Sequence, residues 1–234
     1  AIVYYDKAIR LKGDYAEPHF NLGILLSQQG KDEEAVTQYR RALQIKPDFI
    51  LVHDNLASLL SRQGDLEGAI AHYQQAINLD PGFSKAHNNL GTTQRELGKF
   101  NEAEASFRQA IALKSDYIEA HVNLGITLKE MGRLDDAESS LIKAITLQPN
   151  YAEAHGNLGA ILLKLVRLEE AEIRFRQAIF LKADYADAHH NLGTLLQVLE
   201  RFPEAGASYT QAIMLKPDFA DAYYSIGDVL ERLI

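Results

Sequence analysis

Apolar and polar residues follow helical spacing along the chain, in a unit that repeats every 34 residues. The segment His-x-Asn-Leu-Gly occurs at 19–23, 87–91, 121–125, 155–159 and 189–193, and 53–57 is a variant of it. Each unit holds two helical segments, the first of which is predicted near 16–29, 50–63, 84–97, 118–131, 152–165 and 186–199. The pattern predicts antiparallel helix pairs and no strand.

Counted this way, the chain contains six full repeats with a half repeat at each end. The full repeats are 16–49, 50–83, 84–117, 118–151, 152–185 and 186–219, and the half repeats are 1–15 and 220–234. A single unit is too small to bury its own apolar face, so the units are expected to stack into one array over 1–234.

Columns of small residues mark where the helices should cross. One column is Gly23, Ala57, Gly91, Gly125, Gly159, Gly193 and Gly227, and another is Ala35, Ala69, Ala103, Ala137, Ala171 and Ala205. Glycine costs about 1 kcal/mol inside a helix, so its recurrence indicates a packing reason. Large residues such as Tyr39, Phe107 and Tyr209 should fill the space opposite.

Turn residues separate the helices. Gly30, Gly64, Gly98 and Gly132 stand where a first helix should end in a left-handed residue, and we expect a different turn where Val166 and Glu200 replace glycine. We expect aspartates to cap the next first helix, at Asp14, Asp48, Asp116, Asp184 and Asp218.

The period and these columns resemble the tetratricopeptide-repeat (TPR) family along the whole chain. The resemblance implies an all-α TPR α-solenoid, a right-handed superhelix of antiparallel helix pairs whose first helices line a concave groove. It also implies a scaffold for protein–protein interaction. The wording Ala-His-x-Asn-Leu-Gly is similar to repeats of O-linked N-acetylglucosamine transferases and to repeats that precede bacterial sulfotransferase and glycosyltransferase domains.

The composition limits which classes of partner the chain is expected to bind. The net charge of −8 and the absence of a basic stripe argue against nucleic acid. No apolar run is long enough for a membrane span, and there is no cysteine for a disulfide or thiolate site. We expect a soluble, cytoplasmic protein that binds protein or peptide, without a cofactor. We find no catalytic motif, although the chain could be the non-catalytic part of an enzyme.

An uninterrupted asparagine column is the main candidate for binding: Asn21, Asn55, Asn89, Asn123, Asn157 and Asn191. A carboxamide offers donors and an acceptor, so a regular column of them can bind the backbone of an extended peptide whatever its side chains. The alternative is a local or solubilising role common to this position.

Other candidates to contact the peptide lie around the asparagines in the groove: Phe20, Asp54, Arg62, Lys85, Asn88, Arg95, Val122, Lys129 and His190. One neighbouring column turns acidic toward the C-terminus through Glu153, Asp187 and Asp221. Those acids either favour a basic partner segment or simply suit the positive ends of helix dipoles.

A histidine column also runs through the repeats: His19, His53, His87, His121, His155 and His189. Metal ligands must converge on one ion, whereas equivalent residues of stacked units lie on the order of 10 Å apart. We therefore predict a packing role for these histidines and no metal site.

Two further functions stay open. The chain could be the substrate-recruiting arm of a glycosyltransferase or sulfotransferase whose catalytic domain lies outside it. It could also be a self-assembling array, in which the terminal half repeats associate head to tail.

Overall fold

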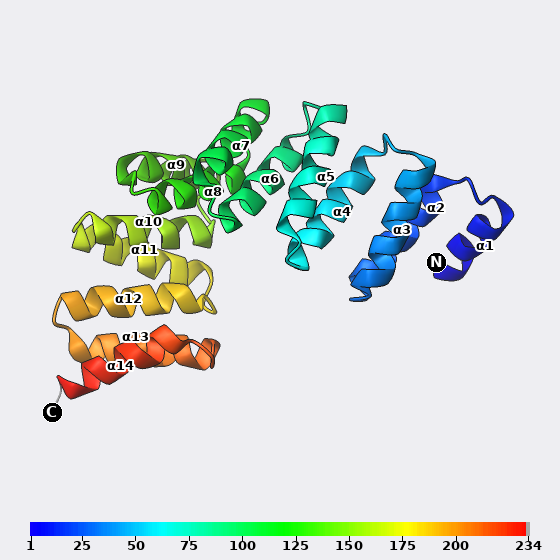
Figure 1. Ribbon diagram of the computed structural model, residues 1–234. Helices are drawn as coiled ribbons and strands as arrows, with labels where there is room; N and C mark the ends of the chain where they lie inside the picture. The colour runs from blue at the N-terminus through cyan, green and yellow to red at the C-terminus, as the bar shows by residue number, and fades with distance from the viewer. Residues whose placement is uncertain (233–234) are drawn as a thin grey trace. The chain divides into compact units, whose positions relative to one another are not determined.

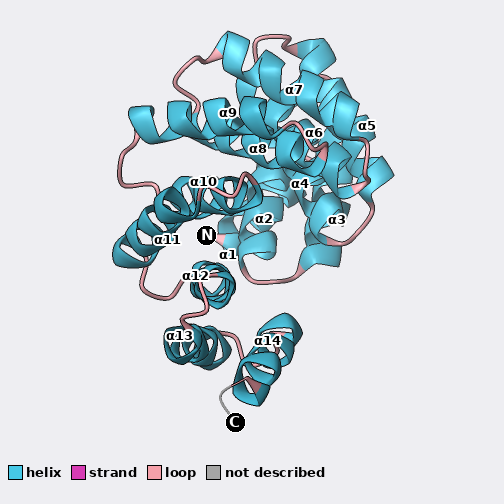
Figure 2. Cartoon of the chain, turned by 90° about the vertical axis from the view of Figure 1, so that its left-hand side faces the viewer, coloured by secondary structure: helices cyan, strands magenta, loops and turns pink. Residues whose placement is uncertain are grey.

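The computed structural model describes residues 1–232, and all of their regular structure is helical (Figures 1 and 2). The helices are α1 (Ile2–Leu11), α2 (Ala16–Gln28), α3 (Asp32–Ile45), α4 (Ile50–Arg62), α5 (Leu66–Leu79), α6 (Ser84–Glu96), α7 (Phe100–Leu113), α8 (Ile118–Glu130), α9 (Leu134–Leu147), α10 (Ala152–Lys164), α11 (Leu168–Leu181), α12 (Ala186–Val198), α13 (Phe202–Leu215) and α14 (Ala220–Glu231).

The all-α prediction is confirmed, because no strand occurs within residues 1–232. The predicted first helices correspond to α2, α4, α6, α8, α10 and α12, each of which begins at the predicted residue. Two residues of the predicted C-terminal half repeat, Leu233 and Ile234, lie outside the described residues.

The first compact unit spans Ala1–Ala120. Its helix pairs are α2 with α3, α4 with α5 and α6 with α7 (Figure 1). Successive pairs join through α3 against α4 and α5 against α6, and α1 packs on α2. First helices also contact one another, α2 with α4 and α4 with α6.

The second unit spans His121–Ile234 and repeats this arrangement. Here α10 pairs with α11 and α12 with α13, while α9 packs on α10, α11 on α12 and α13 on α14. The first helices α10, α12 and α14 again touch in succession.

Glycine lets a large side chain lie directly on the first helix. A Cβ added to Gly23 would lie 2.5 Å from Cε1 of Tyr39, and one added to Gly193 would lie 2.7 Å from Cε1 of Tyr209. Both tyrosines are buried. The expectation that the small column permits close helix approach is therefore confirmed at these crossings.

The turns inside the pairs correct one prediction. Gly30, Gly64, Gly98 and Gly132 have positive φ as expected, but Val166 and Glu200 adopt the same conformation, with φ of 59° and 57°. The hydrogen bonds match too, since Arg167 N–H donates to Leu162 O (2.9 Å) as Lys31 N–H does to Leu26 O (2.9 Å). The expected different turn is wrong, because the flanking helices impose the turn on residues that favour it poorly.

The capping prediction is also wrong at four of its five aspartates, and at Asp116 it stays a prediction. The N-cap residues of α2, α4, α12 and α14 are the aromatics that follow Asp14, Asp48, Asp184 and Asp218, and none makes a side-chain capping bond. The aromatic rings are held at the junction, where the C-cap lysine of the preceding helix lies over each ring, such as Lys46 over Phe49. The aspartate consequently falls one residue too early to cap.

Candidate functional site

One face of each first helix is open to solvent and carries the asparagine column. In α2 this face consists of Glu17, Asn21, Ile24 and Gln28, spaced so that they lie on one side of the helix. We call the corresponding surface of α2, α4, α6, α8, α10 and α12 the ladder face. All six of its asparagines are half-buried, and none is fully enclosed.

Two ladder asparagines bond to their own helix. Asn55 Nδ2 donates to Leu51 O (2.7 Å), and Asn157 Nδ2 donates to Glu153 O (2.8 Å). Each carboxamide has a second N–H and an oxygen, which make no bond to the described residues. The local bond orients the amide and leaves donor and acceptor capacity facing the solvent.

Asn89 is held by its neighbour in unit 1. Its Nδ2 donates to Asp54 Oδ1 (3.3 Å), and Asp54 Oδ2 accepts from Lys85 Nζ (2.8 Å). Asp54 is 1% exposed, whereas the Lys85 side chain is 58% exposed. The buried carboxylate therefore ties α4 to α6 and balances the charge of Lys85.

The remaining cations differ in their partners. Arg62 donates to Ser27 Oγ (2.8 Å) and to Asp32 Oδ1 (3.3 Å). Arg95 is half-buried and makes no hydrogen bond or ion pair to the part of the chain that the structure describes, and Lys129 is half-buried with a polar or electrostatic partner. Arg95 is thus the predicted cation with the most unused donor capacity.

The uncharged candidates divide into covered and accessible groups. Val122 and Asn88 are buried, like Asp54, so these three do not present their side chains to a ligand. Phe20 is half-buried against the rings of Tyr39 and Phe49. Contact of the accessible residues with a peptide stays a prediction.

His190 lies half-buried between two aromatic rings, with centroids 5.5 Å from Tyr209 and 4.9 Å from Phe219. Its Nε2 is enclosed without a hydrogen-bond partner in residues 1–232. Burial lowers the pKa of His190, although Asp221 and Asp187 act in the opposite direction. The ring therefore packs between two aromatic side chains, and its contact with a peptide stays a prediction.

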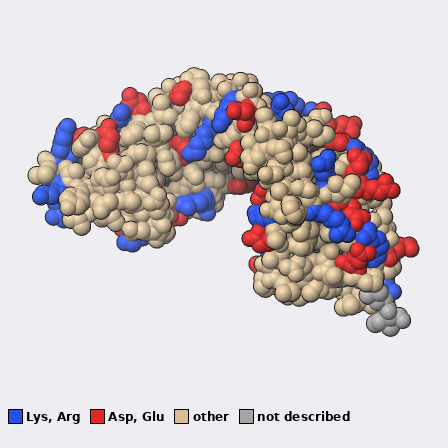
Figure 3. Space-filling view, turned by 180° about the vertical axis from the view of Figure 1, so that it is seen from behind, with Lys and Arg blue, Asp and Glu red and all other residues tan. Residues whose placement is uncertain are grey.

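One carboxylate of the acidic column is already engaged in an ion pair, and two others are exposed. Glu153 Oε1 accepts a hydrogen bond from Lys182 Nζ (2.8 Å). Burial alone would raise the pKa of Glu153, but the bond to Lys182 helps to lower it. Asp187 and Asp221 are exposed. Lys and Arg are interspersed with Asp and Glu over the face drawn in Figure 3, so neither sign dominates that surface.

The histidine column bonds to the junctions between helix pairs. Nε2 of His53, His87, His155 and His189 bonds the carbonyl oxygen six residues earlier, at 3.0, 3.2, 2.9 and 3.1 Å. A carbonyl only accepts, so each of these nitrogens carries the proton. The histidines fasten the loop that leads into their helix. Among the described residues, no group of three or more potential ligands is placed to hold a metal ion.

The residues that face this column from the second helices are not among the predicted site residues. His19 Nδ1 lies 2.7 Å from Gln38 Oε1, and His53 Nδ1 lies 2.9 Å from His72 Nδ1. Both partners stand 19 residues after their histidine. This constant offset within the repeat was the available signal.

None of the described helices has the length and apolar character that a membrane crossing requires.

Comparison with protein families gives matches over most of the chain. A model described as "TPR repeat" matches residues 25–64, 59–95, 91–132 and 199–233. A model described as "Tetratricopeptide repeat" matches residues 122–189. No curated protein matches the sequence.

Several solved structures share the fold. The chain matches one from the APC/C hetero-tetramer Cut9-Hcn1 (19% identity, TM-score 0.82) over 97% of its own length but only 45% of that chain. It matches pilF of Pseudomonas aeruginosa (21%, TM-score 0.77) over 91% of its length and 97% of that chain. It matches YrrB, a TPR protein with an unusual peptide-binding site (26%, TM-score 0.60), over 80% of its length and 96% of that chain.

Proposed function

The chain belongs to the tetratricopeptide-repeat family, and from this premise we propose that it is a non-catalytic scaffold that binds an extended segment of a partner protein along the ladder face. The TPR fold suggests an interaction scaffold in general. The proposal adds the surface and the mode of binding, in which ladder asparagines pair with the peptide backbone.

The observation that carries the proposal is the state of the six asparagines. Each is partly exposed at the same place on its helix, and Asn55 and Asn157 keep unused donors and acceptors. An exposed amide that keeps its hydrogen-bonding capacity can bind a backbone amide group without first breaking a buried bond. Three asparagines lie in each unit, so either unit can hold a segment by itself.

Two further observations support a peptide as the ligand. YrrB, which shares the fold and 26% of aligned residues, is a TPR protein with a peptide-binding site. In unit 2 the exposed Asp187 and Asp221 flank the ladder and favour a segment that carries lysine or arginine.

Capture from a native lysate tests the proposal. The wild type and an Asn55→Ala/Asn157→Ala variant would be immobilised, and the retained proteins identified by mass spectrometry. Asn78→Ala is the matched control, because Asn78 is an exposed asparagine on α5, away from the ladder face. We expect specific partners to be retained by the wild type and the control and to be depleted with the double variant. Equal retention by all three proteins would contradict the ladder.

A second candidate is a substrate-recruiting arm for a glycosyltransferase or sulfotransferase. The observation that favours it is the recurrent Ala-His-x-Asn-Leu-Gly wording and its asparagines. A catalytic α/β domain encoded beyond Ile234 would support this candidate, and capture of a substrate of that enzyme on the ladder face would establish it.

Head-to-tail self-association also stays a prediction. Sedimentation velocity across a wide range of concentrations tests it, since an open heterologous contact gives a series of oligomers and a closed one gives a single dimer.

A further inference from the structure

Two histidines from different helices meet in unit 1. His53 in α4 and His72 in α5 have their Nδ1 atoms 2.9 Å apart, and their ring centroids are 5.2 Å apart at an interplanar angle of 38°. His53 is 8% exposed and His72 is half-buried.

The hydrogen bonds fix where the protons lie when both rings are neutral. His53 Nε2 is 3.0 Å from Pro47 O, so Nε2 carries the proton and Nδ1 of His53 is an acceptor. His72 must then carry its proton on Nδ1 and donate to His53. The pair is satisfied as a neutral unit that joins the loop before α4, α4 itself and α5.

Protonation disturbs this arrangement. One added proton can be accommodated on Nε2 of His72, whose Nδ1–H then still donates to His53. A second proton places two N–H groups against each other at 2.9 Å, with two positive charges in a partly buried site.

The surroundings add to this penalty. Burial, the neighbouring His53 and Arg40 of α3 lower the pKa of His72, and Asp65 at the start of α5 acts in the opposite direction. The folded state therefore resists the charged form of His72.

The neighbouring helix pair offers an internal comparison. At the equivalent place between α2 and α3, His19 Nδ1 faces Gln38 Oε1 at 2.7 Å. A glutamine does not titrate, and a protonated His19 keeps its N–H directed at an oxygen acceptor. Acid therefore leaves the α2–α3 contact intact.

We propose that the His53–His72 contact is an acid-sensitive latch between α4 and α5, closed while the pair is neutral and opened when both rings become protonated. Because the folded state depresses the pKa of His72, the unfolded or opened state binds more protons as the pH falls below about 6.5, and the stability of the closed form decreases through that window.

The latch does not depend on what the ladder face binds. If the proposed function holds, however, α4 also carries Asn55 on the ladder face, so acid would weaken peptide binding in unit 1. A local measurement of α4 and α5 separates the two ideas, because it needs no ligand.

Hydrogen exchange of the full chain, read by mass spectrometry and corrected for intrinsic rates, tests the latch between about pH 8 and pH 5.5. In the wild type, α4 and α5 should lose more protection on acidification than α2 and α3. His72→Gln, which copies the His19–Gln38 pair, should abolish most of that extra loss. In the wild type, the opening equilibrium constant should rise on acidification by up to about tenfold for each unit by which folding depresses the pKa of His72. Equal loss in wild type and H72Q overturns the proposal.

The reverse substitution gives an independent check. Gln38→His should introduce acid-dependent opening of α2 and α3, and a Q38H protein as acid-resistant there as the wild type counts against the latch. Nitrogen-15 NMR of the histidine rings should find the Nδ1–H tautomer of His72 and the Nε2–H tautomer of His53 near pH 8. Any other pair of tautomers contradicts the arrangement.

Discussion

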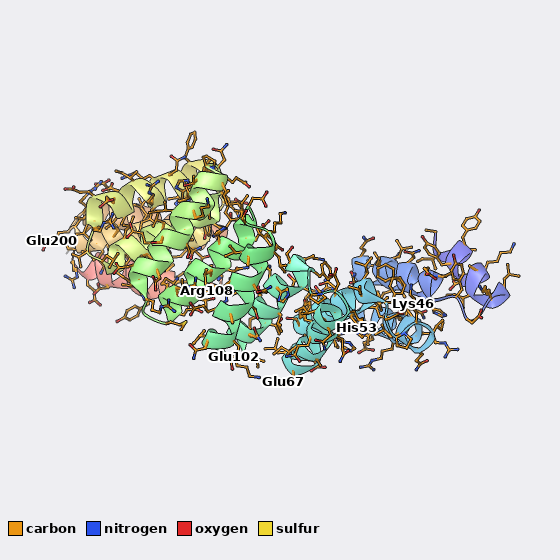
Figure 4. The ribbon with its side chains drawn as sticks, turned by 90° about the horizontal axis from the view of Figure 1, so that it is seen from above. Lys46, His53, Glu67, Glu102, Arg108 and Glu200 are labelled. Atoms are coloured by element: carbon orange, nitrogen blue, oxygen red, sulfur yellow. The ribbon has the colours of Figure 1, made fainter. Side chains whose placement is uncertain are left out.

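At the scale of single residues, backbone strain is stored at two turns of unit 2. Val166 and Glu200 hold φ of 59° and 57°, where Gly132 has 78° at the same place in its repeat. A left-handed residue costs an L-amino acid roughly 1–2 kcal/mol, and β-branched valine is especially unsuited to it. Glu200, labelled in Figure 4, is exposed, so its side chain contributes little to packing.

We predict that Val166→Gly stabilises the protein. Removing the strain gains roughly 1–2 kcal/mol, and the greater freedom of glycine in the unfolded chain offsets about half of it, so a net gain of about 0.5–1 kcal/mol is expected. Thermal and urea unfolding measure it. Gly132→Val is the control and should destabilise the protein, because it places valine in the same turn. A V166G protein less stable than the wild type would refute the strain.

The helix crossings give a second residue-scale prediction. Gly193→Val should destabilise the protein by roughly 1–3 kcal/mol, because the new side chain meets the buried ring of Tyr209. Gly206 is also helical, but its nearest neighbour to an added Cβ is Val229 Cγ1 at 3.8 Å. Gly206→Ala should therefore stabilise by about 0.5–1 kcal/mol. Urea unfolding of both variants checks the pair, and effects of the same sign would contradict this account of the crossings.

At the scale of helices, arginines at the starts of second helices connect successive pairs in unit 2. Arg201 Nη1 donates to Glu172 Oε2 of α11 (2.8 Å), while its Nη2 donates to Glu204 Oε2 of α13 (2.6 Å). Arg167 bridges Glu138 of α9 and Glu170 of α11 in the same way. These paired contacts raise the pKa of both guanidinium groups. An arginine that bonds carboxylates on two helices should stabilise the fold more than an isolated surface ion pair, because one cation connects both helices; we call this arrangement a clamp.

We predict that Arg201→Gln lowers the thermal stability of the protein at low salt and that the deficit shrinks at high salt, since exposed charges are screened. Burial alone would raise the pKa of Glu172, but hydrogen bonds from Arg176 and Arg201 lower it. The stability that ionised Glu172 contributes to the fold is therefore present above about pH 4.3 and is lost as the pH falls through the folded pKa.

Calorimetry at several salt concentrations and at neutral and acidic pH measures both dependences. Lys143→Gln removes an exposed cation of α9 that has no partner among residues 1–232, so it is the control for charge alone. Similar losses in R201Q and in K143Q would argue against the clamp.

The helices could be predicted from the sequence because the repeat supplies the same evidence many times. Apolar spacing and the column of small residues recur in every repeat, turn glycines mark the first four, and the first helices begin where expected. The turns at Val166 and Glu200 could not be predicted, because the conformation there follows from the packing of the flanking helices rather than from local preference. The misplaced aspartate caps have the same origin, since the aromatic junction decides where the helix begins.

The candidate site was predictable only as a face. The 34-residue spacing predicted that all six asparagines share one position on their helices, and all six are partly exposed there. It could not distinguish accessible neighbours from covered ones, because burial of Asp54 depends on Lys85 and Asn89 of another helix. His72 was missed since its column varies between repeats, and only the contact with His53 gives it a role.

At the scale of the whole molecule, function and stability should separate on the ladder face. Asn157 bonds back to Glu153 of its own helix, and alanine is a better helix former than asparagine by roughly 0.5 kcal/mol. Asn157→Ala should therefore leave the stability unchanged or slightly higher. Each lost bond to a peptide backbone, in contrast, costs about 0.5–1.5 kcal/mol of binding.

We predict that binding falls stepwise as asparagines are removed from one unit while folding is preserved. For the Asn123→Ala, Asn157→Ala and Asn191→Ala variant of unit 2, three lost bonds weaken the affinity for a captured partner peptide by about 10- to 1,000-fold. Fluorescence anisotropy with the labelled peptide measures the affinity, and urea unfolding of the same samples measures the stability. The corresponding Asn21→Ala, Asn55→Ala and Asn89→Ala variant tells which unit holds the peptide, although Asn89→Ala also removes a donor to the buried Asp54. An affinity that falls only in proportion to lost stability would assign the asparagines a structural role instead.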